Sequence, residues 1–218
     1  RRAAVWNVAA APPDSLTLRR WCFPVVGCVG YRGYYDEADA KALAAQLEKD
    51  EGLEVRVYGV PAYSTLGWLN WAGGDPLLST FIRYPEGELA RMIFHELAHQ
   101  VVYVSDDTMF NESYATAVER LGVRRWLATQ ASAQARRDYA AFDGRRRAFR
   151  QLSRDTRDEL NRVYAQKTAL AHDPQALPAL KSEAMAHFRQ RYAALKAEWA
   201  AAGAPFDGYD PWVAQANN

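Results

Sequence analysis

The sequence is poor in residues that cross-link chains or bind soft metals, with 2 cysteines, 4 histidines and 3 methionines among 218 residues. It also lacks any apolar run approaching ~18 residues, so no segment of it is expected to span a membrane. Neither sign of charge is in excess, because 27 basic side chains face 26 acidic ones. This balance gives no electrostatic reason to expect a nucleic-acid partner.

Apolar residues are plentiful, however, at 49% of the chain, with 12% aromatic residues. This content is enough for one sizeable hydrophobic core and an appendage. The chain opens with Arg1 and Arg2 rather than methionine, which leaves room for a signal peptide or a lipid anchor upstream.

Both cysteines lie in one short stretch, WCFPVVGCVGY. Pro24 and Gly27 favour a turn between Cys22 and Cys28, so a disulfide is geometrically easy there. Two reduced, buried thiols are the alternative, and a metal pair is less favoured because no histidine or third cysteine is near. A disulfide would indicate an oxidising compartment.

Two segments of the first half have clear periodicity. Residues 36–50 carry apolar side chains at helical spacing and begin with Asp36, which can cap a helix. Residues 53–60 alternate and are rich in valine, which predicts a strand. The segment 62–71 is expected to extend that strand or to form a second one. These patterns predict an α+β fold with a small sheet.

The second half has a different composition, rich in alanine, arginine and glutamine. Its apolar residues between 126 and 202 recur close to a heptad spacing, which predicts a long antiparallel helical hairpin. The expected seam consists of Phe142, Phe149, Leu160, Phe188, Leu195 and Trp199. Arginines alternate with acids here, which is typical of a solvated helix face. We therefore expect a core domain over 1–125 and a hairpin with a tail over 126–218.

The segment FHELAHQ contains the complete pattern H-E-x-x-H, formed by His95, Glu96 and His99. Histidines four positions apart project from one face of a helix and can bind one Zn²⁺, while the glutamate beside them can take a proton from a water. A helix over 88–104 is expected, and its opposite face is expected to be buried through Ala90, Ile93, Phe94, Leu97, Val101 and Val104. An accidental match on an ordinary amphipathic helix is the alternative.

A catalytic zinc needs a third protein ligand, which we expect to be Glu112. It begins a second predicted helix that ends at Gly122 and folds back onto the first. Asp106 and Asp107 are rival ligands, and helix capping is their other role. Glu119 lies two turns beyond Glu112, where it would orient a ligand histidine or remain a surface charge.

Several stretches together resemble a bacterial family described as predicted aminopeptidases: VWNVAAAP, WCFPVVGCVGYRGYY, VYGVPAYSTLGW and FHELAHQVVYVSDDTMFNESYATAVERLGVRRWL. The resemblance covers about residues 5–127 and includes the ligand pattern of gluzincin metallopeptidases. It implies a zincin-like core with zinc on His95, His99 and Glu112, and Glu96 as general base. It also implies a longer protein with an export or lipoprotein signal.

The residues predict the chemistry of peptide hydrolysis, in which Glu96 moves a proton from water to the leaving amine. The oxyanion needs a further donor, for which Tyr63, Tyr103 and Tyr114 are candidates; Tyr103 falls near the metal face of the predicted helix. An extended peptide is expected along the edge formed by VPAYSTLGW. A receptor for a free amine could be Asp75, Glu86, Glu88 or Asp107, and none stands out.

The sequence thus predicts a zinc-dependent peptidase, an aminopeptidase by resemblance, acting on peptides in the bacterial envelope, with the periplasm as the expected compartment. The alternatives are a zinc hydrolase of non-peptide substrates and a metal-binding envelope protein whose hairpin is an interaction module. The hairpin histidines, His172 and His187, are not expected to bind zinc because neither has a partner at ligand spacing.

Overall fold

The computed structural model describes residues 3–23, 27–60, 84–104 and 107–217, and these residues form an α+β protein. The chain divides into two compact units that are each assembled from several segments. The first comprises 1–10, 19–51 and 55–140, and the second 11–18, 52–54 and 141–218. The domain boundary at 125/126 stays a prediction, as does the strand or edge expected over 60–71, most of which lies outside the described residues.

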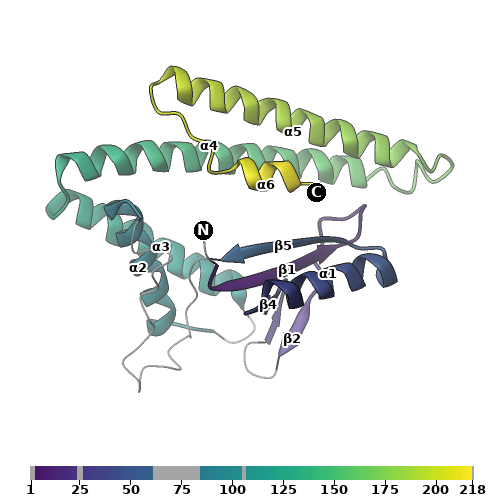
Figure 1. The fold of residues 1–218 in the computed structure, drawn as a ribbon, viewed down its shortest axis with the longest axis horizontal. Coiled ribbons are helices and arrows are strands. Elements are labelled where there is room, and N and C mark those ends of the chain that lie inside the picture. The colour runs from purple at the N-terminus through teal and green to yellow at the C-terminus, as the bar shows by residue number, and fades with distance from the viewer. Residues whose placement is uncertain (1–2, 24–26, 61–83, 105–106, 218) are drawn as a thin grey trace. The chain divides into compact units, whose positions relative to one another are not determined.

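The first unit contains a three-stranded sheet in the order β4-β1-β5 (Figure 1). The central strand β1 (Val5–Ala11) pairs antiparallel with β4 (Arg32–Tyr34), with Trp6 opposite Tyr34. The strand predicted over 53–60 is confirmed as β5 (Glu54–Val60). Alternate β1 residues, Val8 and Ala10, are almost fully buried, as expected for a strand with one face against a core.

The predicted disulfide is confirmed between two short antiparallel strands, β2 (Trp21–Phe23) and β3 (Gly27–Val29). Cys22 and Cys28 stand opposite each other in this ladder, with Cα atoms 3.9 Å apart. The bond therefore joins the two arms of one hairpin.

The helix predicted from the first amphipathic segment is confirmed as α1 (Glu37–Glu51). The Asp36 carboxylate accepts a hydrogen bond of 2.7 Å from the Ala38 amide, as a helix cap does. Ala40, Ala44 and Leu47 are buried at spacings of four and three, so α1 turns one apolar stripe to the core.

Helices α2 (Glu86–Val101) and α3 (Thr108–Thr129) pack along each other in the first unit (Figure 1). The predicted end of the second helix at Gly122 is wrong, because α3 continues for two more turns. Gly122 is an interior contact residue: a Cβ there would lie 2.6 Å from Cγ of Phe94. The glycine leaves room for the Phe94 ring of α2 against the backbone of α3.

The predicted burial of the apolar stripe on α2 is wrong for its second half. Leu97 is 49% exposed and Val101 75% exposed, and Val104 is also exposed. Helix α3 instead covers the face that carries Glu88, Ala98 and His99, all of which are buried. The polar face of α2 packs against α3 because α3 supplies polar partners for it.

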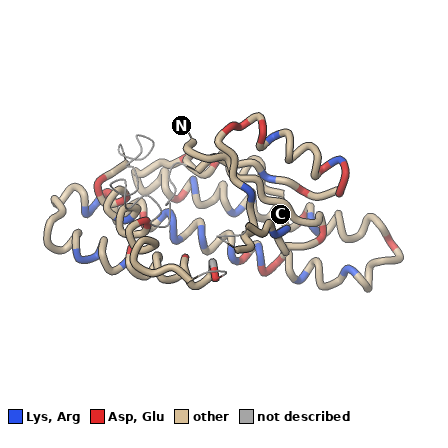
Figure 2. The backbone as a smooth tube through the Cα atoms, turned by 90° about the horizontal axis from the view of Figure 1, so that it is seen from below, with Lys and Arg blue, Asp and Glu red and all other residues tan. Residues whose placement is uncertain are grey.

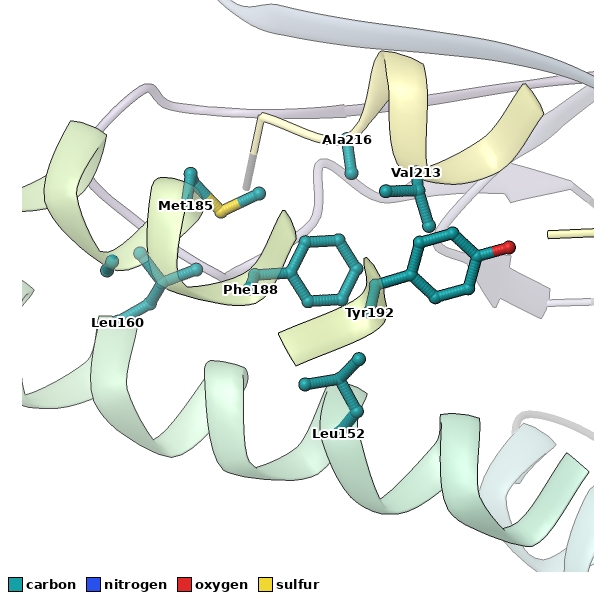
Figure 3. Packing of buried hydrophobic residues seen from close by; sticks show 8 residues of the cluster. Leu152, Leu160, Met185, Phe188, Tyr192, Val213 and Ala216 are labelled. Carbon is teal, nitrogen blue, oxygen red and sulfur yellow. The ribbon is translucent and has the colours of Figure 1, made fainter. Parts of the chain in front are cut away.

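The predicted helical hairpin is confirmed as two long helices, α4 (Ala133–Tyr164) and α5 (Ala176–Ala201). Trp126 to Thr129 belong to α3 rather than to the hairpin. A short helix that the sequence did not predict, α6 (Asp210–Gln215), contributes Val213 to the same core. Figure 3 shows Leu152 and Leu160 of α4 facing Met185, Phe188 and Tyr192 of α5, with Val213 and Ala216 beside them.

The other predicted seam residues, Phe149, Leu195 and Trp199, pack against this cluster. Phe142 makes an edge-to-face contact with Phe206, with ring centroids 6.2 Å apart. Among the described helices, none is both long and apolar enough to cross a membrane.

Candidate metal centre

Helices α2 and α3 bring three metal-ligating side chains together. Nε2 of His95 lies 3.3 Å from Nε2 of His99 and 3.4 Å from Oε2 of Glu112. Nε2 of His99 lies 3.6 Å from the other oxygen of Glu112. Within the described ranges, these residues form the one group of three or more potential ligands that could hold a metal ion.

The spacing of these atoms can be compared with that of a zinc site. Four ligands at 2.0–2.1 Å from a tetrahedral Zn²⁺ stand about 3.3–3.4 Å from one another. The separation of 3.3 Å between the two Nε2 atoms matches this edge length, and the carboxylate of Glu112 places one oxygen 3.4 Å from His95 and the other 3.6 Å from His99. Two imidazoles and a carboxylate are also a donor set that zinc accepts, and three protein ligands leave a fourth position for a water or substrate.

A chain of charged side chains fixes the first histidine. Oε2 of Glu119 accepts a hydrogen bond of 3.0 Å from Nδ1 of His95 and one of 2.8 Å from Arg91. Arg91 also donates to Glu88 at 3.1 Å. Glu88 and Glu119 are almost fully buried, so each carboxylate needs this cation. Because Nδ1 carries the proton given to Glu119, Nε2 of His95 is the atom left to bind a metal.

The second histidine is held differently. Nδ1 of His99 is buried and, among the described residues, has no hydrogen-bond partner. Its position depends on packing, since it is buried on the face of α2 that α3 covers. His95 is therefore held by hydrogen bonds, and His99 is held by close packing.

The charged groups of the cluster shift one another's pKa values. The hydrogen bond to Glu112, with a second to Glu119, raises the pKa of His95 to about 9. The same contact lowers the pKa of Glu112, whereas burial lowers the pKa of His99. Burial acts to raise the pKa of Glu119, but hydrogen bonds from His95 and Arg91 outweigh it and lower that pKa. Without a metal, the cluster thus holds a proton on His95 between two carboxylates.

The predicted base, Glu96, follows His95 directly on α2 and is half-buried. Its charge acts on the imidazole of His95 and contributes to its raised pKa, so the carboxylate lies near the cluster. It is not one of the three clustered ligands. Its role as general base stays a prediction.

The predicted tyrosines are placed less favourably. Helix α2 ends at Val101, so Tyr103 follows the helix instead of extending its metal face, and its role stays a prediction. Tyr114 stacks on Phe110, with ring centroids 6.3 Å apart, and Tyr63 lies outside the described residues. Burial raises the pKa of Tyr31, and the charges of Tyr58, Glu112 and Tyr103 raise it further. Tyr31, which sequence analysis did not consider, therefore has a pKa that responds to the charge of Glu112.

The predicted acidic candidates are mostly engaged elsewhere. Asp107 caps α3 by accepting a hydrogen bond of 2.9 Å from the Phe110 amide, which is the capping role considered for it. Glu88 belongs to the Arg91 chain, and Glu86 is exposed in the first turn of α2. Asp75 and Asp106 lie outside the described residues.

Asn111 is a second residue whose role sequence analysis missed. Its buried side-chain amide accepts from the Val104 amide at 2.8 Å and donates to the Val104 carbonyl at 2.7 Å. This pair of bonds ties the chain just after α2 to the start of α3, next to Glu112. The only sequence signal was an asparagine directly before the ligand glutamate.

The fold and the cluster define an α+β protein with a two-histidine, one-carboxylate group that could hold a metal ion. A family model described as "Putative aminopeptidase" matches residues 1–218, so the chain belongs to that family. Comparisons with curated proteins and with solved structures gave no match.

Proposed function

We propose that this protein is a zinc-dependent aminopeptidase of the gluzincin type, built on a zincin-like core. The observation that carries the proposal is the spacing of the ligand atoms of His95, His99 and Glu112, which is close to the edge of a tetrahedral zinc site. Membership of the aminopeptidase family supports a peptide substrate.

The ligand residues have distinct tasks. His95 and His99 bind through Nε2, and Glu112 binds through its carboxylate. A bound Zn²⁺ supplies Lewis acidity, which polarises the scissile carbonyl and lowers the pKa of a water toward ~7. Glu119 holds the Nδ1 proton of His95 and so keeps the imidazole in its metal-binding tautomer.

Proton transfer falls to Glu96. Its carboxylate takes a proton from the attacking water and delivers it to the nitrogen of the leaving amine. Tyr103 is proposed to donate a hydrogen bond to the oxyanion. The disulfide between Cys22 and Cys28 supports work in an oxidising compartment, which we propose to be the periplasm of the bacterial envelope.

The test separates ligand from base. Metal analysis of protein purified without added metal should give about one zinc per chain, and His95→Ala should lose it. Glu96→Gln should retain zinc and lose turnover by a factor on the order of 10² or more. Glu86→Gln is the matched control, since it changes an exposed glutamate in the first turn of the same helix. Full zinc retention by His95→Ala, or parental turnover by Glu96→Gln, would contradict the proposal.

A second measurement addresses the aminopeptidase class. A peptide library should be cleaved at its first peptide bond, and acetylation of the amino terminus should abolish that cleavage. Equal cleavage of free and acetylated peptides would leave a zinc peptidase but reject the aminopeptidase assignment. Tyr103→Phe should retain zinc and lower kcat if the phenol contacts the oxyanion.

A further inference from the structure

Helix α3 has two faces of different character. Asn111, Ala115, Glu119 and Val123 recur every four residues and are all buried on the side packed against α2. The opposite side is exposed along the length of the helix, which is about 33 Å for its 22 residues. This outer face of α3 comprises Met109, Phe110, Ser113, Ala117, Arg120, Leu121, Arg124, Arg125 and Ala128.

The outer face combines apolar and positive groups. Met109 is 82% exposed and Leu121 63% exposed, so both apolar side chains are open to solvent. In the described parts of the chain, the guanidinium groups of Arg120, Arg124 and Arg125 contact no acceptor. The acids of this segment do not share the face: Asp107 caps the helix, and Glu112 and Glu119 bind the histidines of α2.

The arginines of α4 and α5 differ from those of α3 in having acidic neighbours. Basic and acidic residues are interspersed along the long helices (Figure 2), and several are paired, as Arg146 is with Asp143 and Arg191 of α5 is with Asp155. Such pairs need no external partner. The outer face of α3 has the positive charges without the acids, and it adds exposed apolar side chains between them.

We propose that the outer face of α3 binds an anionic phospholipid surface. A helix with arginines beside exposed apolar side chains lies in the interface plane of a membrane, with its apolar groups entering the headgroup region. Guanidinium groups pair with lipid phosphates, often through two parallel hydrogen bonds. Leu121 lies among the arginines, and Met109 lies at the N-terminal end of the helix. The apolar contacts are therefore distributed along the helix and do not fill one pocket. A soluble acidic partner would engage the arginines without needing these side chains.

This arrangement also fixes an orientation for the metal centre. Glu112 and Glu119 project from the side of α3 that faces α2, opposite to the outer face. A membrane bound by the outer face would therefore leave the cluster of His95, His99 and Glu112 directed away from the lipid. The inference does not depend on the proposed catalytic function, since it uses other residues.

The experiment measures binding of the full chain to vesicles by co-sedimentation. Vesicles of phosphatidylcholine with about one third phosphatidylglycerol should bind the protein, and pure phosphatidylcholine vesicles should bind it far less. The triple variant Arg120→Gln, Arg124→Gln, Arg125→Gln should bind the anionic vesicles on the order of 100-fold more weakly, because each arginine near an anionic surface contributes about a factor of five. Leu121→Ser should weaken vesicle binding by a smaller factor than the triple variant does. This loss should remain at high salt, because salt does not screen the apolar contribution.

The matched control is Arg154→Gln, Arg157→Gln, Arg162→Gln, which removes the same charge from exposed arginines of α4. It should bind the anionic vesicles like the parent. Equal losses in the two triple variants would overturn the proposal, since overall charge would then suffice. Parental vesicle binding by Leu121→Ser, together with equally strong binding to soluble polyglutamate, would also overturn it in favour of a soluble acidic partner. Thermal melts of each variant confirm that the chain stays folded.

Discussion

The helix pair α2–α3 and the helix pair α4–α5 are held together by different means. The hairpin buries large side chains, among them Phe188 and Leu160, with aromatic neighbours around them. The pair α2–α3 meets through small residues, Ala98, Ala115 and Gly122, and through the charged chain of Arg91 and its partners. The pair α2–α3 thus has fewer large apolar contacts than the hairpin and contains the polar cluster of His95, His99 and Glu112.

The largest expected effect comes from breaking the apolar pair. Phe188 is 2% exposed and lies at the centre of the hairpin cluster. Phe188→Ala should lower the free energy of unfolding by about 3–5 kcal/mol, because the lost contacts leave a cavity. Denaturation in urea measures the change. The exposed Leu121→Ala should stay within about 0.5 kcal/mol of the parent, and a similar loss there would argue against a localised core.

The next effect comes from separating the polar pair. Gly122→Ala places a methyl group against the Phe94 ring, so the ring or the helices must shift, at a cost of about 1–3 kcal/mol. Zinc affinity should fall as well, because ligands come from both helices. Gly144→Ala on α4 is the control, since nothing lies within 4 Å of the added atom there. That variant should be more stable by up to about 1 kcal/mol. Equal changes in stability in the two variants would contradict the prediction, because only Gly122 has the Phe94 ring against it.

A smaller change tests the hydrogen bond behind the ligand. Glu119→Gln keeps the shape of the side chain but removes the charge shared by His95 and Arg91. Zinc affinity should fall about 10–100-fold, as is usual for partners of ligating histidines. Competition with a chromophoric chelator measures it. Glu183→Gln, at an exposed position of α5, should leave the affinity unchanged. An unaltered zinc affinity in Glu119→Gln would show that Glu119 does not orient His95 for metal binding.

The smallest expected effect is a pH dependence of the metal-free protein. The pKa of His95 is raised to about 9, above its unfolded value of roughly 6.5. The stability contributed by its proton is therefore complete below about pH 6.5 and is lost as the pH rises through 9. Thermal melts of chelator-treated protein should decline between pH 7 and 10 more steeply than those of zinc-loaded protein, in which the metal has replaced that proton. Parallel profiles would contradict the assignment of the proton to His95.

Elements defined by a local pattern were predictable from the sequence. The stripe of α1, the strand β5 and the seam of α4 and α5 were each predicted from residues a few positions apart, and all three elements occur as expected. The two histidines were predictable for the same reason. Glu112 also lies beside the two histidines, as predicted, because only a short segment connects α2 to α3.

Features that depend on contacts between distant residues were not predictable. A glycine that ends a helix and a glycine that admits a neighbouring ring look alike in the sequence, so Gly122 was misassigned. Arg91 gains its role from Glu119, 28 positions away. The exposure of Leu97 and Val101 follows from α3 covering the other face of α2, where the polar partners are. Periodicity identifies an apolar stripe but does not say which face a partner helix will select.

The paired hydrogen bonds between Asn111 and Val104 have a thermodynamic consequence. Ordering a backbone residue costs roughly 1–2 kcal/mol of conformational entropy, and a site that forms only on metal binding must supply it at that moment. Here the amide of Asn111 already fixes the approach to Glu112, and Glu119 already fixes His95. Loading with zinc should then order little additional chain. Its calorimetric heat-capacity change should be small, as for an ion entering a rigid cage.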